Sequence, residues 1–365
     1  MQLEQKIVFL KLEKNLRMKI GNSLIGGDNP CFIIAELSAN HNGSIDVAIE
    51  TIKAAKIAGA DAIKLQTYTP DTLTIDCDNE HFKIDGGTLW DGKTLYELYG
   101  EAYTPWEWHQ KLFEVAKAEG LICFSSPFDF TAVDFLEELN VPAYKIASFE
   151  IQDIPLIAYT ASKGKPIIIS TGIAEEADVQ LAVDTCRKAG NNDIILLKCT
   201  SSYPAPLELA NLKTIPDLKQ RFKVEVGFSD HTYGSLAPTV AVTLGAKVIE
   251  KHFILDKSIG GPDADFSLDV TEFTEMVSKV RDTEKLLGIV SYEISEKVKK
   301  NKKFARSLFV CENVKKGEII TKENIRSIRP GYGLHPKYYY EVLGKVFSED
   351  VERGEPLYLN MIESL

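Results

Sequence analysis

The sequence predicts an α/β fold, namely a (β/α)8 TIM barrel followed by a small β-rich domain. Short apolar, β-branched runs alternate with amphipathic stretches, and eight such runs fall within roughly 250 residues, which is typical of a (β/α)8 barrel. A doubly wound open sheet is the alternative, but no Gly-rich dinucleotide turn follows the first run. From residue 304 onward, short strand-like runs are separated by Gly turns, which indicates a separate β-rich region.

The expected strands are short apolar runs, and the expected helices carry an apolar stripe at helical spacing. We expect strands at Cys31–Ala35, Ala62–Leu65, Leu121–Phe124, Ala143–Ile146, Pro166–Ile169, Ile194–Leu197, Val224–Phe228 and Ala246–Ile249. We expect helices at Asp46–Ala58, Pro105–Glu119, Thr131–Leu139, Ile154–Ser162, Glu176–Ala189, Leu212–Arg221, Leu236–Leu244 and Glu272–Leu287.

The connection from Thr67 to Thr104 is much longer than an ordinary barrel loop, which takes only a few residues. It contains G-G-T-L-W-D-G-K-T-L-Y-E-L-Y, and a short helix is expected at Lys93–Tyr99. Long loops at a barrel mouth usually carry function, so we interpret this connection as a lid or specificity loop. A surface excursion without function is the alternative.

The chain is expected to divide into four segments. Residues 1–17 form an N-terminal extension outside the folded core, because they lack the features of a signal peptide and Met18 offers a second start. Residues 18–288 form the barrel, residues 289–303 a charged linker or exposed helix, and residues 304–365 the small domain. A domain of that size is marginal alone and usually needs docking support.

Composition narrows the class of protein. The net charge of -11 argues against nucleic-acid binding, which requires a basic face, but not against a small anionic substrate held by a few lysines. The six cysteines include no C-x-x-C pair, as expected of free thiols in a reducing cytosol, so a cytoplasmic protein is expected. No run approaches about 18 consecutive apolar residues, so no membrane span is expected.

Two of the six histidines, His231 and His252, each follow one of the last two predicted strands. In a parallel sheet these strand ends lie side by side, so both imidazoles are expected in one crevice. Neutral imidazole is a common ligand of divalent transition metals, which predicts a two-histidine metal site with open coordination positions. The alternative is that each histidine is a hydrogen-bonded structural residue.

Polar or ionisable residues follow every predicted strand, and in a barrel these ends converge on the active-site mouth. Lys64 and Lys145, with hydroxyls around them, predict a cradle for a phosphate or carboxylate. Glu36 and Glu150 are candidate general acids or bases. An anion cradle beside a Lewis acid indicates a phosphorylated small molecule that reacts with a carbonyl compound. The structural alternative is that the lysines form buried ion pairs with these glutamates and that the hydroxyls cap helices.

Seven motifs resemble the sialic acid synthase family, whose members condense phosphoenolpyruvate with an N-acetylated sugar. They are F-I-I-A-E-L-S-A-N-H-N-G-S, D-A-I-K-L-Q-T-Y, Y-K-I-A-S-F-E, I-S-T-G, K-C-T-S-S-Y-P, G-F-S-D-H-T and I-E-K-H-F. The C-terminal R-S-L, K-K-G-E and I-R-P-G-Y-G resemble that family's antifreeze-like (SAF) domain. The resemblance runs in order from about residue 18 to the end of the chain.

The resemblance implies a role for each matching residue. The metal ligands would be His231 and His252, with manganese, magnesium or cobalt as the divalent metal. Phosphoenolpyruvate would be surrounded by Lys64, Ser126, Lys145, Ser148, Ser170, Ser201, Tyr203 and Ser229, although Ser126 and Ser201 replace a Thr and an Asn of some relatives. The sugar would meet Glu36, Gln66, Asp263 and, from the small domain, Arg329. In the family that domain covers the neighbouring subunit's barrel, which implies a domain-swapped homodimer.

The segments around Trp90, Trp106 and Arg329 most resemble the pseudaminate-forming branch of the family, which implies the substrate 2,4-diacetamido-2,4,6-trideoxy-L-altrose. Neuraminate and legionaminate synthesis are the alternatives within the family. Two other interpretations stay open. One is a Schiff-base aldolase that uses Lys64 or Lys145, and the other is a non-catalytic sugar-binding protein.

Overall fold

The computed structural model describes residues 18–85, 87 and 90–363, so the expected N-terminal extension, residues 1–17, lies outside the described residues. The chain divides into two compact units between Gly288 and Ile289. The first unit contains the eight expected strands, and the second contains the β-rich region expected near the C-terminus.

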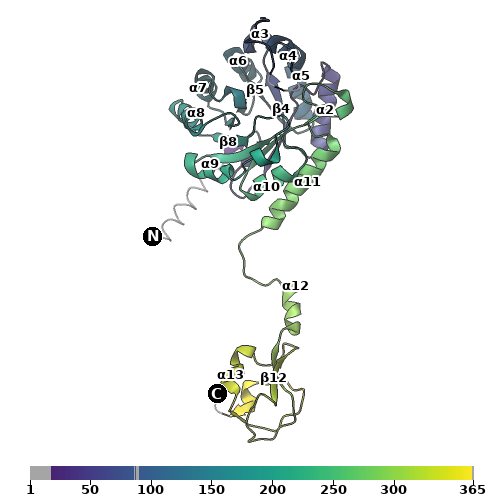
Figure 1. Ribbon diagram of the computed structural model, residues 1–365, viewed down its shortest axis with the longest axis vertical. Coiled ribbons are helices and arrows are strands. Elements are labelled where there is room, and N and C mark those ends of the chain that lie inside the picture. Colours follow the sequence, from purple (N-terminus) through teal and green to yellow (C-terminus); the bar gives the residue numbers. More distant parts are fainter. Residues whose placement is uncertain (1–17, 86, 88–89, 364–365) are drawn as a thin grey trace. The chain divides into compact units, whose positions relative to one another are not determined.

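The first unit is built on a closed barrel of eight parallel strands, in which each strand pairs with the next along the chain and the last pairs with the first (Figure 1). The strands are β3 (Phe32–Glu36), β4 (Ala62–Thr67), β5 (Ile122–Pro127), β6 (Tyr144–Ile146), β7 (Ile167–Ser170), β8 (Ile194–Cys199), β9 (Glu225–Asp230) and β10 (Val248–His252). Each overlaps one of the eight expected runs, so the predicted (β/α)8 fold class is confirmed.

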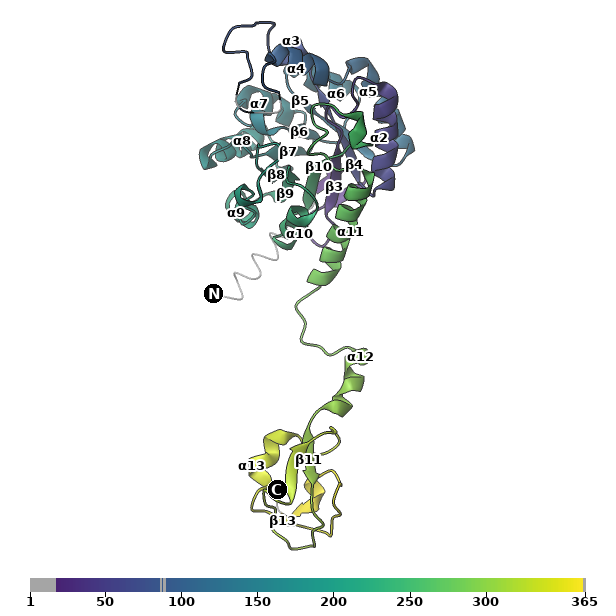
Figure 2. The same cartoon turned by 45° about the vertical axis from the view of Figure 1, so that its right-hand side comes forward.

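Helices surround the barrel (Figure 2). Their apolar faces pack against the outward side chains of the strands. The helices are α2 (Ile45–Ile57), α5 (Trp106–Ala118), α6 (Phe130–Glu138), α7 (Ile154–Ser162), α8 (Glu176–Lys188), α9 (Thr214–Phe222), α10 (Leu236–Thr243) and α11 (Val270–Leu287). On α2, the buried Ala48, Ile52 and Ala55 show how a stripe at helical spacing meets the sheet. Side chains of Ser44, Asp129 and Asp269 cap α2, α6 and α11 by accepting backbone N–H groups.

A short hairpin precedes the barrel and was not anticipated from the sequence. It pairs β1 (Met18–Ile20) with β2 (Ser23–Ile25), and its apolar side chains join the barrel's interior cluster. In that cluster Met18, Ile20 and Ile25 pack with Phe32 and other inward residues of the strands. The hairpin therefore contributes to a layer of hydrocarbon inside the barrel, whereas the polar side chains gather toward the carboxyl ends of the strands.

The long connection between β4 and α5 has structure of its own. It contains α3 (Pro70–Leu73) and α4 (Leu95–Ala102), which contact each other, so the short helix expected there begins two residues later and extends further. Between the helices the chain returns on itself, where Ile84 N–H donates to the Lys93 carbonyl and Gly92 N–H to the Ile84 carbonyl, both at 2.9 Å. The described part of the connection therefore has regular structure of its own.

The second unit is small and has its own core. Antiparallel pairs join β11 (Ser307–Val310) to β12 (Ile325–Ile328) and β13 (Val346–Phe347) to β14 (Ile362–Glu363). The core side chains are Leu308, Val310, Val314, Ile320, Ile325, Val342, Phe347, Val351, Leu357 and Ile362. Before it, α12 (Glu296–Lys299) and a 3-10 turn at Lys300–Phe304 occupy part of the expected linker. In the described part of the chain, no helix is both long and apolar enough to cross a membrane.

One glycine inside the barrel makes a sharp test of its packing. A Cβ on Gly227 would lie 2.6 Å from Leu197 Cδ2 and 2.7 Å from Val248 Cβ, and it would also overlap the Val248 carbonyl oxygen. We expect Gly227→Ala to destabilise the protein by about 1–3 kcal/mol, the usual cost of overpacking. The midpoint of thermal unfolding, followed by circular dichroism, measures this.

The matched control is Gly100→Ala in α4, where the new Cβ would make only an ordinary 3.9 Å contact with Pro70. Alanine favours helix over glycine, so this change should leave stability the same or raise it by up to about 1 kcal/mol. Equal unfolding midpoints for the two variants would contradict the packing described for Gly227.

Candidate active site at the carboxyl ends of the strands

Four charged side chains are buried together inside the barrel mouth. Lys64 of β4 pairs with Glu36 Oε2 of β3, and its Nζ lies 3.7 Å from Glu250 Oε2 of β10. Lys145 of β6 lies on the other side of the same carboxylate, with its Nζ 3.4 Å from Glu250 Oε1. Ser229 Oγ donates to Glu250 Oε1 at 3.1 Å. Two ammonium groups are therefore balanced by two carboxylates in a site closed to solvent.

Glu250 lies between the two lysines, a position that the sequence analysis did not predict for it. The ion-pair alternative for Lys64 and Glu36 is what the structure shows, but Lys145 pairs with Glu250 rather than with Glu150. The signal was available, because Glu250 lies two residues before His252 on the same strand, so both side chains face inward.

The pKa values of this cluster follow from burial and mutual charge. Burial alone would lower the pKa of Lys64, but Glu250 and Glu36 outweigh it and raise that pKa above the ordinary value. Burial lowers the pKa of Lys145 despite Glu250. Burial raises the pKa of Glu36 to about 7, against the opposing charge of Lys64. The ammonium group of Lys145 therefore loses its proton more readily than that of Lys64. Glu36 is a carboxyl that titrates near neutral pH.

Hydroxyl groups line the next part of the mouth. Ser126 Oγ accepts a hydrogen bond from Lys64 Nζ at 3.4 Å, and Ser201 Oγ donates to Ser148 Oγ at 2.8 Å. Ser170 Oγ is buried and has no hydrogen-bond partner. A Cβ on Gly172 would lie 2.6 Å from Ser148 Oγ and would also overlap Ser201 Oγ, so only glycine allows these hydroxyls to meet here. These hydroxyl groups therefore form a compact polar surface, in which Ser170 Oγ still lacks a hydrogen-bond partner.

The two histidines lie together at the same mouth, with ring centroids 5.5 Å apart. Their rings also contact Tyr203 and Phe266, with centroids 4.3 Å apart for Tyr203 and His231 and 4.9 Å apart for Phe266 and His252. His231 Nδ1 lies 2.9 Å from the Thr200 carbonyl, to which it donates, so Nε2 is the nitrogen left for another partner. Burial alone would lower the pKa of His231, but the neighbouring Cys199 outweighs it and raises that pKa above the ordinary value. The prediction that both imidazoles share one crevice agrees with this geometry.

His252 presents a donor set suited to a metal. Its Nδ1 is buried without a hydrogen-bond partner and lies 3.7 Å from Asp263 Oδ2. Burial, together with the charges of His231 and Lys64, lowers the pKa of His252 well below its usual range, which keeps the ring neutral. Among the described residues, no group of three or more His, Cys, Asp or Glu side chains is placed to hold a metal ion. The pair therefore fits an open site completed by other ligands, rather than a closed structural site.

A buried ion pair joins the ends of the two strands that carry the histidines. Lys251 Nζ lies 2.6 Å from Asp230 Oδ2, and both side chains are fully buried. Asp230 Oδ1 also accepts from Thr232 N–H at 2.8 Å. Each member of the pair neighbours one histidine in sequence, so the pair joins the ends of β9 and β10 and holds the two imidazoles in register.

The expected sugar-facing residues form a second polar network beside the charges. Gln66 Nε2 donates to Glu36 Oε1 at 3.2 Å and to Ser38 Oγ at 3.0 Å. Ser38 Oγ in turn donates to Asp263 Oδ2. Glu150, on a 3-10 turn after β6, has a buried Oε2 without a partner, and burial raises its pKa to about 7 against the opposing charge of Lys145. The mouth therefore holds two carboxyls that titrate near neutral pH.

A cavity of about 420 Å³ opens over these groups. Its lining joins Gln66, Ser148, Glu150, Tyr203, His252 and Asp263 with side chains of the long connection. Arg329, the remaining expected site residue, is exposed at the end of β12 in the second unit. Its predicted contact with the sugar stays a prediction.

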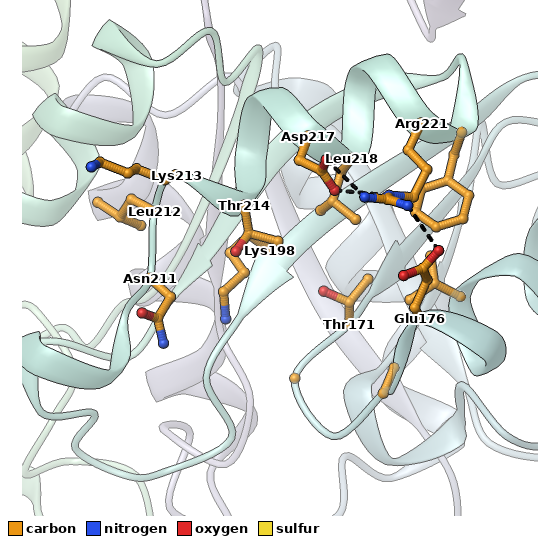
Figure 3. Close-up of a pocket in the computed structure, with 14 residues that line it drawn as sticks. Thr171, Glu176, Lys198, Asn211, Leu212, Lys213, Thr214, Asp217, Leu218 and Arg221 are labelled. Atoms are coloured by element: carbon orange, nitrogen blue, oxygen red, sulfur yellow. Dashed lines mark hydrogen bonds and ion pairs between the residues drawn. The ribbon is translucent and has the colours of Figure 1, made fainter.

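A larger cavity of about 520 Å³ lies between the loops that follow β7 and β8 and helix α9 (Figure 3). Arg221 in its lining forms ion pairs with two carboxylates. Its Nε lies 3.0 Å from Asp217 Oδ2, and its Nη1 lies 2.9 Å from Glu176 Oε1. Lys198, also in its lining, donates to the Cys199 carbonyl. Glu150, Tyr203, His252 and Asp263 line the smaller cavity but not this one, so the smaller cavity is the candidate active site.

The chain matches the model of the NeuB family over residues 51–292, and the SAF domain over residues 305–363. It belongs to the NeuB family. It is 54% identical over 340 residues to a pseudaminic acid synthase of Campylobacter jejuni, covering 93% of this chain and 98% of that protein. It is 49% identical to a pseudaminic acid synthase of Helicobacter pylori, covering 92% and 98%.

Among solved structures, the crystal structure of N-acetylneuraminic acid (sialic acid) synthetase from Leptospira borgpetersenii in complex with citrate is similar, with a TM-score of 0.69 and 33% identity. The match covers 78% of this chain and 94% of that one. The chain is thus an enzyme of the sialic acid synthase family with a C-terminal SAF domain, as the sequence motifs implied.

The raised pKa of Glu150 predicts how stability depends on pH. The folded protein keeps a proton on Glu150 up to about pH 7, whereas a carboxyl with the ordinary pKa of 4.5 releases it earlier. The folded state binds more protons in this window, so this residue makes stability fall as pH rises from about 4.5 to 7. We expect Glu150→Gln to remove this loss.

Denaturant titrations of wild type and Glu150→Gln between pH 5 and pH 8 measure the effect. The variant should gain about 1–3 kcal/mol relative to wild type on going from pH 5 to pH 8, because each unit of pKa shift corresponds to about 1.4 kcal/mol. The difference at pH 5 serves as the internal control, since it measures any effect of the amide that does not depend on ionisation. A difference that does not change with pH would contradict the buried, proton-holding carboxyl.

Proposed function

We propose that the chain is a pseudaminic acid synthase, which condenses phosphoenolpyruvate with 2,4-diacetamido-2,4,6-trideoxy-L-altrose and water to give pseudaminic acid and phosphate. The observation that carries this choice is the 54% identity to a protein of that name over nearly the whole length of both chains. The identity to the neuraminic acid synthetase is 33%. The buried charges and paired histidines support the chemistry.

Phosphoenolpyruvate takes the lysine end of the mouth in this proposal. Lys64 and Lys145 provide two ammonium groups for its phosphate and carboxylate. In the free protein Glu36 pairs with Lys64 and Glu250 contacts both lysines, so the anionic groups of the substrate compete with these two carboxylates for the ammonium groups. The remaining contacts come from Ser126, Ser148, Ser170, Ser201, Tyr203 and Ser229. Ser170 Oγ, buried without a partner, has a hydrogen bond to gain.

His231 and His252 hold a divalent metal, with manganese, magnesium or cobalt as candidates. When bound, the metal supplies a Lewis acid that polarises the aldehyde of the open-chain sugar. The Thr200 carbonyl fixes the tautomer of His231, and the neutral His252 ring offers its unpartnered Nδ1. Gln66, Asp263 and Glu36 orient the sugar so that its aldehyde carbon faces phosphoenolpyruvate.

The reaction then needs one new carbon–carbon bond and the loss of phosphate. C3 of phosphoenolpyruvate attacks the aldehyde carbon, whose oxygen takes up a proton. Water adds to C2 and loses a proton, which gives a tetrahedral centre. The bond from C2 to the phosphate oxygen then breaks as the C2 hydroxyl becomes a carbonyl, and the proton of that hydroxyl passes to the phosphate. Glu36 and Glu150 exchange these protons, since a carboxyl with a pKa of about 7 serves as acid or base near neutral pH. Lys64 and Lys145 stay with the departing phosphate.

We further propose that the protein works as a domain-swapped homodimer in which Arg329 of one subunit reaches the sugar in the barrel of its partner. The exposure of Arg329 and the separate core of the second unit support this arrangement. A Schiff-base aldolase is the second candidate, because burial lowers the pKa of Lys145 and a neutral amine is what that chemistry needs. Trapping with borohydride separates the two, since only the aldolase leaves a covalent lysine adduct.

The sugar assignment is tested by product analysis. The enzyme is incubated with phosphoenolpyruvate, a divalent metal and, in separate reactions, the altrose-type precursor, N-acetylmannosamine or the legionaminate precursor. We expect phosphate release and a product of the mass of pseudaminic acid with the first sugar, at a kcat/KM at least about tenfold above the others. A preference for either of the other two sugars would overturn the assignment to pseudaminate and keep the family chemistry.

The metal role is tested on His231→Ala and His252→Ala, with His81→Ala as the matched control, since His81 is exposed and does not line the cavity. We expect both site variants to lose one equivalent of bound manganese in equilibrium dialysis and to lose turnover. Their far-ultraviolet circular dichroism should match that of wild type. Stoichiometric manganese binding by either site variant would sink the two-histidine site, whatever the activity.

A further inference from the structure

The candidate cavity has two chemically different walls. The strand ends contribute the polar wall, including Gln66, Ser148 and Asp263. The long connection contributes an aliphatic wall that comprises Leu73, Ile84, Leu95 and Leu98. Aromatic rings continue the apolar side, where Tyr68 lies 5.8 Å from Tyr99 and 5.1 Å from Phe128 between centroids. A ligand seated here can contact ionisable and amide groups from the strand ends and hydrocarbon from the long connection.

The aliphatic wall is held in place by contacts at its ends. Trp90 Nε1 donates to the Pro262 carbonyl at 3.3 Å, which ties the connection to the loop after β10. The ring of Trp90 also lies 6.2 Å from that of Tyr203. At the start of α4, Thr94 and Glu97 form a capping box that fixes Leu95 and Leu98 on the helix. The wall is therefore an ordered surface of the site.

None of the four side chains in the aliphatic wall carries a hydrogen-bonding atom. A sugar hydroxyl turned toward them loses its hydrogen bond to water and gains no replacement partner, which disfavours binding. A methyl group in the same place gains from burial instead. Because the proposed function holds the reacting end of the open-chain sugar at the polar strand ends, its far end is left to meet the hydrocarbon of the connection.

We propose that the aliphatic wall is a subsite for the terminal methyl group of a 6-deoxy sugar, and that it selects N-acetylated 6-deoxy aldoses against their 6-hydroxy counterparts. This proposal rests on the proposed function for the orientation of the sugar. Its selectivity comes from Ile84 and Leu73, which reach the cavity from different segments of the connection. The chemical class of the substrate is thereby set by a surface that takes no part in bond making.

The experiment uses two alditols that cannot react because they lack the aldehyde, namely 2,4-diacetamido-2,4,6-trideoxy-L-altritol and its 6-hydroxy counterpart. Their dissociation constants are measured by calorimetry on the full chain. We expect wild type to bind the 6-deoxy alditol at least about tenfold more tightly, in line with an apolar pocket that discriminates against an added hydroxyl. Equal affinities, or no binding of either alditol, would overturn the subsite.

Variants locate the selectivity. Ile84→Thr keeps the branched shape and adds a hydroxyl, and Leu73→Asn keeps the size and adds an amide, so each should lower the ratio of affinities at least about threefold. Ile75→Thr is the matched control, because Ile75 is 60% exposed, lies in the same connection and does not line the cavity. The control should keep the wild-type ratio. An unchanged ratio in both wall variants would overturn the proposal.

The outcome separates the subsite from the proposed function. Selective binding of the 6-deoxy alditol without conversion of the altrose-type precursor would support the subsite and reject pseudaminate synthesis. Conversion of that precursor with no selectivity between the alditols would support pseudaminate synthesis and reject the subsite.

Discussion

The barrel depends on the mutual neutralisation of four buried charges. Lys64, Lys145, Glu36 and Glu250 are each at most 5% exposed, and they come from four different strands. An unpaired charge in such a place costs several kcal/mol, whereas a paired and hydrogen-bonded set is tolerated. The cluster can form only when β10 closes on β3, because Glu250 must come between lysines of β4 and β6. Closure of the sheet and formation of the anion cradle are therefore one event.

The same closure positions the imidazoles. In the register of β10 with β3, His252 lies opposite Glu36, and in that of β10 with β9, Lys251 lies opposite Asp230. Inward positions thus carry the reactive groups, while the alternate positions carry the buried ion pair that locks the strand ends. Strand alternation lets one short segment serve chemistry on one face and rigidity on the other.

The strands and their polar ends were predictable, because period and residue type are local properties of the sequence. His231 and His252 could be placed in one crevice for that reason. The spacing of Glu250 to His252 was enough to predict that its side chain faces inward. Its pairing with Lys145, in place of Glu150, could not be predicted, because it depends on the register between strands. Nor could the fit of Gly172 against Ser148 and Ser201, or the packing of Ile20 inside the barrel, because each arises from segments far apart in sequence.

The long connection links the shape of the site to its acid–base chemistry. Burial is the largest cause of the raised pKa of both Glu36 and Glu150, and Glu150 lines the same cavity as Leu98 and Tyr99. The hydrocarbon of the connection also withholds solvation from the Glu150 carboxylate, which lines the same cavity. Any change in the connection that admits water would therefore act on both properties together. The hydrogen bond from Trp90 to Pro262, which ties the connection to the loop after β10, thus supports the acid–base groups as well as the apolar wall.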